Sequence, residues 1–532
     1  MRRRRKHWGW GFEDEQLSDA TLRESAAAVA VVLGFGETEP QAPVPLERCA
    51  LPEPRLRPTA ALRECCDGSD HARARHAYGG SYRDVVRGFR GEFENPPDVV
   101  AMPRSETELE RMLEWAIGAG AAVIPYGGGT SVVGGVEPLV DRDRFDGVVT
   151  VDMAEFDRVL EVDDVSQTAR IGAGASGPSL EYQLREHRLT LRHYPQSYTH
   201  ATLGGMIATR AAGHHATRLT HIDELVQSVR AITPAGVWES LGVPASGAGI
   251  SPDRMLLGSE GTLGVITEAW IRVRPRPSFS AETAVRFPDF LSGAAGMREI
   301  VQSGLGPTQC RLLYGAEARL TGAGDGSEAV LMLGYESWRH NVKPRMALAL
   351  ECCADHGGYS EPTDVRARDS ERSEVGSWRE SFIRAPYLRD VLVSMGVIAE
   401  TFETAITWRR FESLHRAVAE ATTAAMHGIC GAGVLTCRIT HVYPDGPALY
   451  WTVLAPGRRG SELEQWDAIK RAAADAVVAG GATITHHHAV GRDHRPWYDR
   501  ERPDPFAAAL RAAKAALDPA GALNPGVLID PA

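Results

Sequence analysis

The 532-residue sequence has no C-x-x-C pair among its eight cysteines, which excludes a zinc ribbon and a thioredoxin-like redox site. Such cysteine usage favours a reducing cytoplasm. Lysine is also scarce, because only four of the 58 basic residues are lysines, namely Lys6, Lys343, Lys470 and Lys514. We interpret the bias toward arginine as codon usage in a GC-rich genome, which suggests a bacterial origin.

Long apolar runs are absent as well. The apolar stretch Ala26–Leu33 is too short to span a bilayer, and acidic residues separate it from the basic run Arg2–Lys6. We therefore predict neither a signal peptide nor a transmembrane helix. The basic run is interpreted as a solvated, frayed terminus, with contact to anionic lipid as the alternative. We expect the protein to be located in the cytoplasm, either free or attached peripherally to the inner face of the membrane.

The remaining composition is that of an ordinary globular protein, with 43% hydrophobic and 24% charged residues. The chain exceeds the roughly 250–300 residues at which a single core stops growing, so two or more domains are expected. Its net charge of -11 argues against nucleic acid as a partner, because phosphate binding needs a concentrated cationic surface.

Composition shifts divide the chain into four segments. Residues 1–95 form an N-terminal arm that is irregular after a short helical lead, with a Pro-rich linker at Glu39–Pro58. Residues 96–277 mix strands with helices, one of which is capped by Ser105 and Glu108, and Pro275 with Pro277 marks the boundary. Residues 278–500 alternate helical patterns at 345–356, 408–426 and 462–479 with strand candidates at 329–335, 434–442 and 449–454. This alternation favours an α+β domain with an antiparallel sheet, followed by a C-terminal segment at 501–532.

A glycine-rich loop is the strongest chemical signal in the sequence. Pro125–Ser131 directly follows the apolar strand Ala121–Ile124, and consecutive glycines let several backbone N–H groups point into one concavity. A phosphate or pyrophosphate is the expected occupant. The loop has neither the P-loop nor the Rossmann spacing, so neither ATP nor NAD is indicated. A tight turn without a ligand is the alternative for such a loop taken alone.

Further glycine-rich segments follow at Gly204-Gly205, Thr209–Gly213 and Gly258–Ile266. Together with the loop, they resemble the PCMH-type FAD-binding domain of the vanillyl-alcohol oxidase superfamily. The resemblance implies an α+β fold, with a two-subdomain FAD-binding domain followed by a substrate or cap domain that has an antiparallel sheet. It also implies non-covalently bound FAD, with the C-terminal segment returning to the flavin. The implied flavin contacts are Pro125, Tyr126, Gly127, Gly128, Gly129, Thr130, Ser131, Gln196, Ser197, Tyr198, Thr199, His200, Ala201, Thr202, Thr209, Arg210, Ala211, Ala212, Glu260, Gly261, Thr262, Leu263, Gly264, Val265 and Ile266.

Other stretches narrow the resemblance to the alkyldihydroxyacetonephosphate synthase family. They are Trp8–Gly11, Leu203–Gly213, Glu224–Gly236, Glu400–Trp408, Cys437–Thr440 and His486–Gly491. The resemblance implies that Tyr450 is catalytic, that Arg389 binds the substrate phosphate and that Arg311 is needed for activity. It also implies that the triple histidine His486, His487 and His488 is part of the active site.

Each of these residues also has a structural interpretation. Tyr450 could be a half-buried strand residue, and Arg311 or Arg389 could form ordinary ion pairs. In a strand, His486 and His488 would face one way and His487 the other, so the trio by itself is poorly shaped to bind one metal. We predict no metal and expect these histidines to transfer protons near a flavin.

Some positions depart from the family pattern, because Gln196 stands where an acidic residue is usual and His200 where an aromatic one is usual, and Gly213–Thr217 replaces a lysine-bearing segment. These differences leave the substrate open, and no role is predicted for His214, His215 or His441. The closing stretch Leu517–Val527 is shared by many FAD-linked oxidases, and it would let Asn524 reach the flavin edge.

The resemblance implies an FAD-dependent transferase of ether-lipid synthesis, which exchanges the acyl group of acyl-dihydroxyacetone phosphate for a fatty alkyl group. Its partners would be a lipid-like phosphate substrate, a fatty alcohol and a second copy of the chain in a homodimer. The alternative is an FAD-linked 2-hydroxyacid dehydrogenase or oxidase of the D-lactate or glycolate type, in which Arg311 or Arg389 binds a carboxylate. In some such enzymes a metal assists, for which His441 and the triple histidine could supply ligands. A flavin-binding scaffold without chemistry is the third hypothesis.

Overall fold

The computed structural model describes residues 3–215, 217, 219–360 and 385–530. Its first sheet supports the glycine-rich loop and has the strand order β1-β2-β4-β3, in which β2, β4 and β3 are parallel. Its strands are β1 (Cys66–Asp67), β2 (Val99–Ala101), β3 (Ala121–Tyr126) and β4 (Gly147–Asp152). Helix α4 (Glu106–Gly118) packs against β3, and its N-terminus is capped as expected, because the Ser105 hydroxyl accepts the Glu108 N–H. The loop therefore starts at the carboxyl end of a buried strand.

A second sheet, antiparallel throughout, completes the first domain. Its order is β5-β6-β10-β8-β9, with β5 (Val159–Asp163), β6 (Thr168–Gly172), β8 (Val226–Thr233), β9 (Gly236–Glu239) and β10 (Val265–Arg272). A two-stranded ribbon of β7 (Leu189–Thr190) and β11 (Arg274–Pro275) lies beside the exit from this domain. Helices α5 (Gly177–Glu186), α6 (Leu203–Thr209) and α7 (Asp253–Leu256) belong to the same part of the chain. The boundary expected near residue 277 falls between β11 and β12.

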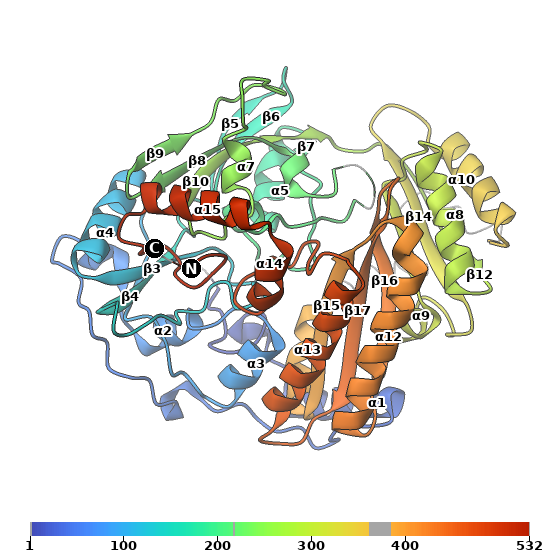
Figure 1. The fold of residues 1–532 in the computed structure, drawn as a ribbon, viewed down its shortest axis with the longest axis horizontal. Coiled ribbons are helices and arrows are strands. Elements are labelled where there is room, and N and C mark those ends of the chain that lie inside the picture. Colours follow the sequence, from blue (N-terminus) through green and yellow to red (C-terminus); the bar gives the residue numbers. More distant parts are fainter. Residues whose placement is uncertain (1–2, 216, 218, 361–384, 531–532) are drawn as a thin grey trace.

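The second domain is built on a six-stranded antiparallel sheet of order β12-β14-β13-β16-β17-β15 (Figure 1). Its strands are β12 (Phe279–Phe287), β13 (Gln309–Leu313), β14 (Ala329–Ser337), β15 (Val397–Ala405), β16 (Val434–Val442) and β17 (Pro447–Pro456). Four long helices contact it, α8 (Phe290–Gln302), α10 (Lys343–Asp355), α12 (Trp408–Cys430) and α13 (Glu462–Ala479), and a short one, α9 (Gly315–Leu320), contacts β14 and β16.

The two faces of this sheet have different roles because side chains alternate along each strand. On β17, Leu449, Trp451 and Val453 enter the hydrophobic core that includes α8, α10, α12 and α13. The intervening Tyr450 and Thr452 face a cavity instead. A register shift in the β16–β17 pairing between Ile439 and His441 marks a β-bulge, and both Thr440 and His441 line that cavity.

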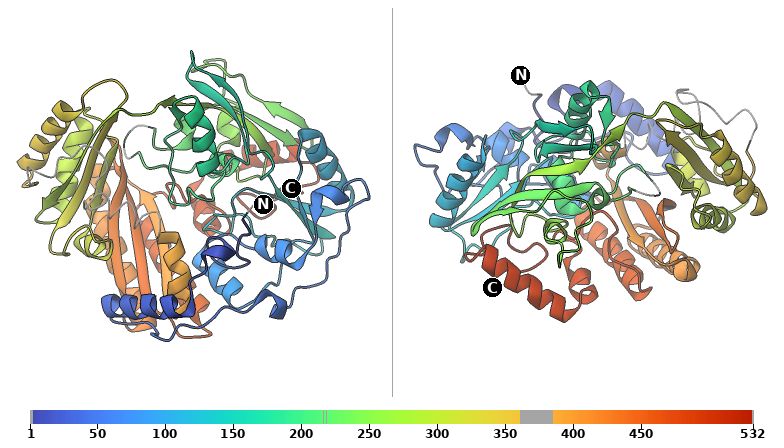
Figure 2. Two further views of the ribbon diagram at one scale, coloured as in Figure 1. Left: turned by 180° about the vertical axis from the view of Figure 1, so that it is seen from behind. Right: turned by 90° about the horizontal axis from the view of Figure 1, so that it is seen from above.

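The N-terminal arm is more ordered than its sequence predicts. It contains α1 (Asp19–Leu33), α2 (Asp70–Arg75) and α3 (Tyr82–Phe89), so the expectation of an irregular segment after the helical lead is wrong for residues 70–89. Figure 2 shows α1 lying against the second domain, where it shares a core with residues of β15 and β17.

The basic run at the N-terminus is not a frayed tail over the residues described. Lys6 pairs with Asp390 at 3.1 Å, and only 10% of either side chain is exposed. Arg3 pairs with Asp14, and Arg5 packs against the glycine-rich loop. Arg2 lies outside the described residues. The interpretation as a solvated terminus is wrong, because Arg3 has an acidic partner within the arm, Lys6 has one at Asp390, and part of the run is buried.

The C-terminal segment returns to the first domain. Helix α14 (Arg495–Glu501) is followed by α15 (Asp504–Leu517), whose Leu510 and Leu517 pack against the core under the second sheet. Leu523 forms a parallel bridge with Val123 of β3. No helix in the described part of the chain is both long and apolar enough to cross a membrane.

The expected fold class is confirmed, because the chain has a first domain with two sheets and an α+β domain with an antiparallel sheet. The predicted helix 462–479 and strand 434–442 agree with α13 and β16 to the residue. The helix predicted at 408–426 continues to Cys430, where Gly431 ends it in the left-handed conformation.

Candidate active site

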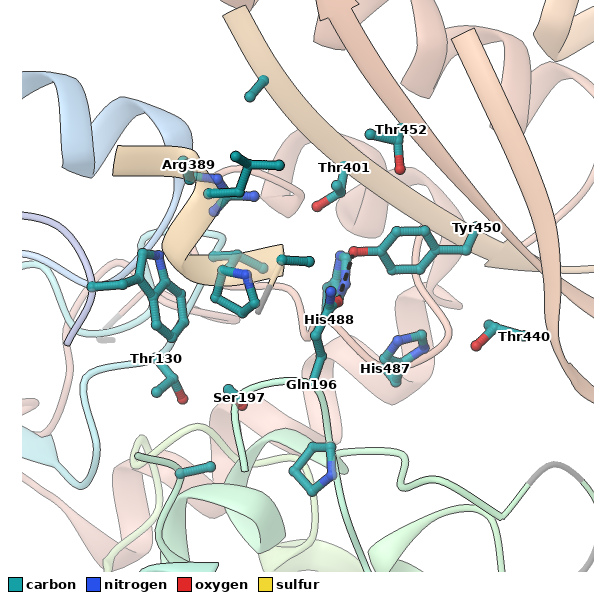
Figure 3. A pocket seen from close by; sticks show the side chains of 18 of the residues that line it. Thr130, Gln196, Ser197, Arg389, Thr401, Thr440, Tyr450, Thr452, His487 and His488 are labelled. Carbon is teal, nitrogen blue, oxygen red and sulfur yellow. Dashed lines mark hydrogen bonds between the residues drawn. The ribbon is translucent and has the colours of Figure 1, made fainter. Parts of the chain in front are cut away.

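A cavity of about 790 Å³ lies between the first domain and the inner face of the six-stranded sheet (Figure 3). Its floor is the glycine-rich loop with residues 195–213, and its opposite wall carries polar side chains from β13, β15, β16 and β17. A third region is apolar and is lined by α1 with Ala385, Pro386, Leu388 and Leu392. The volume is within the roughly 300–1,000 Å³ range of small-molecule and cofactor sites.

The glycine-rich loop presents backbone hydrogen-bond donors that have no acceptor in the described part of the chain. The backbone N–H groups of Gly128, Gly129, Thr130 and Ser131 have no acceptor among the described residues, although all four residues line the cavity. Backbone donors are normally satisfied, so a row of unused ones marks an anion site. This donor set, together with the size of the cavity, fits the pyrophosphate of FAD.

Close packing explains why the loop consists of glycine. A Cβ atom on Gly128 would lie 1.9 Å from the His200 carbonyl oxygen, and one on Gly127 would lie 2.2 Å from Thr202 Oγ1. Gly129 has a φ of +62°, which side chains rarely tolerate. The loop is thus pressed against the segment 200–202, and the two form one floor.

The structure brings together about half of the predicted flavin contacts. Those that line the cavity are Gly127, Gly128, Gly129, Thr130, Ser131, Gln196, Ser197, Ala201, Thr202, Thr209, Ala211 and Ala212. The others do not line it, namely Pro125, Tyr126, Tyr198, Thr199, His200, Arg210, Glu260, Gly261, Thr262, Leu263, Gly264, Val265 and Ile266. Several of these support the loop from behind, since a Cβ on Gly261 would touch Pro125 and the Glu260 carboxylate accepts the N–H groups of Val490 and Gly491.

Asn524 is one of these supporting residues. Its side-chain amide donates to the carbonyl oxygens of Gly135 at 3.0 Å and Glu260 at 2.6 Å, and it is buried. It is not among the cavity-lining residues, so the expected approach to the flavin edge is not seen. The residue instead ties the C-terminal segment to the loop.

Tyr450 occupies the centre of the opposite wall. Its hydroxyl donates to Gln196 Oε1 at 3.3 Å across the cavity, as Figure 3 shows. The Arg438 guanidinium lies 3.8 Å from the centre of its ring, and Arg438 in turn pairs with Glu317 at 2.5 Å. Burial raises the pKa of Tyr450, so the phenol is protonated at neutral pH. Tyr450 therefore faces the cavity rather than the hydrophobic core, and its catalytic role stays a prediction.

The triple histidine forms a loop rather than a strand, so the predicted alternation of its side chains is wrong. The physical cause is the buried carboxylate of Glu403 on β15. It accepts the backbone N–H groups of His486 (2.6 Å), His487 (3.1 Å) and His488 (2.9 Å), together with the hydroxyl of Thr485. The backbone curls around one anion, and the His487 and His488 side chains then both reach the cavity.

Glu403 is ionised at neutral pH, as an acceptor of several backbone N–H groups should be. Burial alone would raise its pKa, but the adjacent His487 and the other two histidines outweigh burial and hold the pKa of Glu403 well below its usual value. The stabilisation from its charge is therefore complete at neutral pH, and it is lost only as the pH falls through the folded-state pKa.

We expect Glu403→Gln to destabilise the protein by roughly 2–3 kcal/mol and to reduce turnover, because an amide NH₂ would face backbone donors that now bond to a carboxylate oxygen. Thermal unfolding and steady-state turnover would measure the two effects. Glu412→Gln, at an exposed position of α12, is the matched control and should change neither. Wild-type stability of Glu403→Gln would contradict the anchoring role.

The imidazole of His486 belongs to a group of side chains joined by short contacts. His486 Nε2 lies 2.7 Å from the Tyr443 hydroxyl and 3.1 Å from His221 Nε2, while His486 Nδ1 lies 3.0 Å from His487 Nδ1. His441 donates from Nε2 to the Gly213 carbonyl, and its buried Nδ1 has no partner in the described part of the chain. Burial lowers the pKa of His441, His486 and His488 well below the usual value, so these rings are neutral at neutral pH.

Nitrogen atoms of His441, His486 and His487 lie within 4.8 Å of one another, a spacing that could accommodate a metal ion. However, both His486 nitrogens already have hydrogen-bond partners in the protein. The sequence-based expectation of no metal stays a prediction.

The two predicted arginines have different surroundings. Arg311 is buried on β13 and donates to the carbonyl oxygens of Thr440 (3.1 Å) and His214 (3.1 Å), and burial with the charge of Arg438 lowers its pKa to about 9. Arg389 lines the cavity and donates to the Gly80 carbonyl. Among the described residues no carboxylate pairs with Arg389, so the ion-pair interpretation fails there.

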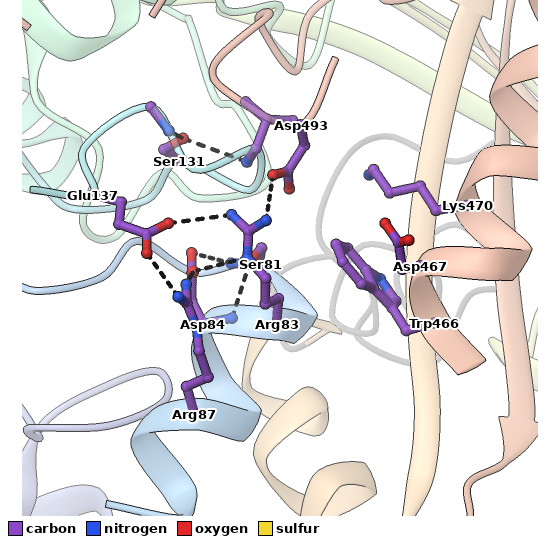
Figure 4. Close-up of polar contacts among 12 residues, drawn as sticks. Ser81, Arg83, Asp84, Arg87, Ser131, Glu137, Trp466, Asp467, Lys470 and Asp493 are labelled. Carbon is purple, nitrogen blue, oxygen red and sulfur yellow. Dashed lines mark hydrogen bonds and ion pairs between the residues drawn. The ribbon is translucent and has the colours of Figure 1, made fainter. Parts of the chain in front are cut away.

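A network of ion pairs surrounds the segment that follows the glycine-rich loop (Figure 4). Arg83 on α3 pairs with Asp493 at 2.7 Å and with Glu137 at 3.3 Å, and Arg87 pairs with Glu137 at 2.6 Å and Asp84 at 2.8 Å. The N-terminal arm, the segment after the glycine loop and the chain after the triple histidine are thereby joined around the site.

Sequence reasoning missed several residues of this site. Arg438 stands in a stretch that carried the resemblance, and the alternation of its strand places it beside Tyr450. Glu403 was also within such a stretch, but nothing local indicates that it anchors a loop about eighty residues later. The sequence predicts a helix in the region of α1. However, no local pattern shows that four residues of this helix line the cavity, namely Ala28, Val29, Val32 and Leu33.

Comparison with known proteins agrees with this geometry. Residues 97–242 match the FAD binding domain family, and residues 276–528 match the C-terminal domain of FAD linked oxidases. FAD is therefore the cofactor of this enzyme, and the loop donors described above fit it.

An alkyldihydroxyacetonephosphate synthase from Caenorhabditis elegans is 32% identical over 490 residues, which cover 87% of this chain and 81% of that one. A solved alkyldihydroxyacetonephosphate synthase structure superposes with a TM-score of 0.81 at 25% identity and covers 98% of both chains. A mitochondrial D-lactate dehydrogenase from Arabidopsis thaliana is more distant, at 26% identity over 82% of this chain and 74% of that one. Both of these organisms are eukaryotes, so the bacterial origin stays a prediction. The chain belongs to the alkyldihydroxyacetonephosphate synthase family of FAD-dependent enzymes.

Proposed function

We propose that the protein exchanges the acyl group of acyl-dihydroxyacetone phosphate for a fatty alkyl group, a step of ether-lipid synthesis. The observation that carries this proposal is the apolar region of the cavity. Val29, Val32 and Leu33 of α1, with Leu392 and Leu454, line a continuation of the space that holds Tyr450 and Arg389. A small 2-hydroxyacid needs no such wall, whereas an aliphatic chain gains roughly 0.8 kcal/mol for each buried CH₂ group.

Two residues of the polar wall, Tyr450 and His488, have pKa values that their surroundings shift in opposite directions, which suits one to act as an acid and the other as a base. Tyr450 has a raised pKa and holds its proton at neutral pH, while His488 has a lowered pKa and keeps a free lone pair. Pairs of groups whose pKa values are pushed apart typically supply acid and base to one reaction. We assign to His488, with His487 beside it, the removal of the proton from C1 of the substrate, and to Tyr450 the donation of a proton to the departing fatty carboxylate.

Arg389 completes the site as the group that binds the phosphate. When FAD is bound, it supplies an electrophilic ring system next to these residues. The C1–oxygen bond to the fatty acid breaks, and a bond from C1 to the oxygen of the fatty alcohol forms. The hydroxyl proton of the alcohol replaces the proton that Tyr450 gave to the carboxylate, and the protonated histidine returns its proton to C1. No net oxidation or reduction of the substrates occurs. The apolar wall meanwhile keeps water away from the reacting carbon.

Product analysis tests this proposal. The holoenzyme is incubated with acyl-dihydroxyacetone phosphate and hexadecanol, and mass spectrometry should detect the alkyl ether product together with the free fatty acid. Under anaerobic conditions these substrates should leave the flavin oxidised at the end of turnover. Bleaching of the flavin by D-lactate or glycolate, without ether formation, would overturn the proposal in favour of the hydroxyacid alternative.

The role of Arg389 has its own prediction. We expect Arg389→Ala to weaken substrate binding about 10- to 100-fold, because a charge-assisted hydrogen bond contributes roughly 1.5–3 kcal/mol. Arg389→Lys should give a smaller loss, since lysine keeps the charge but not the two-pronged geometry. The KM for acyl-dihydroxyacetone phosphate would measure both, with FAD content as the control that should not change. Loss of FAD in either variant would contradict the assignment.

We also propose that the protein works in the cytoplasm, attaches peripherally to the inner face of the membrane, and forms a homodimer. The support for attachment lies in α1, where Val31 is 85% exposed and Val32, which also lines the cavity, is 54% exposed. The basic run is less suited to this role, because Arg3 and Lys6 are paired with acidic residues of the chain.

A further inference from the structure

Two arginines of the N-terminal arm converge on the glycine-rich loop without lining the cavity. Arg5 Nη1 and Arg75 Nη2 each lie 3.4 Å from the carbonyl oxygen of Gly128. Arg75 is the last residue of α2, and Arg5 belongs to a short hairpin closed by a bridge to Phe12. Neither was predicted from the sequence to take part in the site, and neither lines the cavity itself.

No carboxylate forms an ion pair with Arg5 or Arg75 in the described part of the chain. The acidic group that influences Arg5 is Asp152, but its carboxylate bonds to His76 at 3.1 Å and to the N–H of Ala154. This differs from Arg83 and Arg87 on the adjacent helix, which are paired with Glu137, Asp84 and Asp493. Two like charges held together without a counter-ion are costly unless a ligand supplies one.

The surroundings show the strength of the local positive potential. Burial, with the charge of Arg75, lowers the pKa of Arg5 to about 9. Burial, with the charges of Arg5 and Arg75, lowers the pKa of the neighbouring His200 to about 2. Arg5 Nε is buried and has no partner within the described residues.

The position of the pair relative to the loop links it to the unused donors. In a trans peptide the carbonyl and the following N–H point in opposite directions. Because both guanidiniums hold the Gly128 carbonyl, the N–H of Gly129 points away from them. That N–H is one of the four loop donors without a protein acceptor.

We propose that Arg5 and Arg75 form the cationic support of the FAD pyrophosphate site: they fix the orientation of the Gly128–Gly129 peptide and supply the positive charge that balances the pyrophosphate. The two guanidinium charges match the two negative charges of that group. The N-terminal arm is in this way part of the cofactor site, although its residues stand far from the loop in sequence.

FAD release from the holoenzyme tests this proposal. After dilution, free flavin is followed by its fluorescence for wild type, Arg5→Gln and Arg75→Gln. We expect release to be about 10–100-fold faster in each variant, with a weaker dependence on salt concentration, since charge-assisted contacts are lost. Arg5→Lys should fall between wild type and Arg5→Gln. Arg4→Gln, at an exposed residue of the same arm near Glu13, is the matched control and should release FAD like wild type.

Thermal unfolding of the apoprotein separates this role from a purely structural one. Removing an uncompensated charge should leave the unfolding temperature of the apoprotein unchanged or higher, while the extra stability given by FAD should shrink. Unchanged FAD release in both glutamine variants would overturn the proposal, as would an equal loss of stability with and without FAD. None of these measurements uses the substrates, so they stand apart from the test of the proposed reaction.

Discussion

The Gly128→Asp variant is expected to be purified without FAD. Its Cβ would lie 1.9 Å from the His200 carbonyl oxygen and 2.6 Å from the carbonyl carbon, so the loop and the segment 200–202 could not keep their present contact. The added carboxylate would also stand beside the N–H donors that fit the pyrophosphate, and like charges placed together cost several kcal/mol. We expect the affinity for FAD to fall by more than about 100-fold.

The ratio of flavin to protein absorbance, and a titration of the variant with FAD, measure this effect. Gly247→Asp is the matched control, because Gly247 has open space around it and lies away from the cavity. Circular dichroism of Gly128→Asp should still show folded protein. A yellow variant with wild-type FAD content would contradict the assignment of the loop.

The second large effect is expected from Tyr450→Phe, which should lose most turnover while keeping its flavin and its fold. The substitution removes one hydroxyl and a hydrogen bond of 3.3 Å to Gln196, so the stability lost should be only about 1 kcal/mol. General acid–base catalysis typically contributes about 10²–10⁴-fold, and the loss in kcat should lie in that range.

Steady-state kinetics with acyl-dihydroxyacetone phosphate and a fatty alcohol would measure this loss. Tyr335→Phe is the matched control, because Tyr335 is equally buried on β14 and its hydroxyl has no partner among the described residues. It should keep wild-type turnover. Equal turnover in both variants would show that the Tyr450 hydroxyl takes no part in the reaction.

The elements that could be predicted from the sequence are those whose signals are local. Helix α13 and strand β16 have clear periodic patterns and lie where these patterns place them. The glycine-rich loop is likewise recognisable from seven consecutive residues after an apolar strand. In contrast, β1, β7 and β11 have only two residues each, and pairing with distant strands defines them.

The parts of the site that escaped prediction depend on contacts between distant segments. The residues 486–488 have no turn signal of their own, and the carboxylate of Glu403 overrides the strand conformation expected for them. Arg5 and Arg75 meet at Gly128 only because the arm folds across the first domain. A basic run near a terminus is usually solvated, and nothing local distinguishes the half-buried Arg5 from the exposed Arg3 and Arg4.

The anchoring of the triple histidine by its main chain has a consequence for mutagenesis. Because Glu403 binds the N–H groups of these residues, the shape of the loop does not depend on which side chains it carries. Histidines exchanged one at a time would thus leave the backbone path in place. The kinetic changes in such a series would report on each imidazole separately, which is rarely true of residues held by their own side chains.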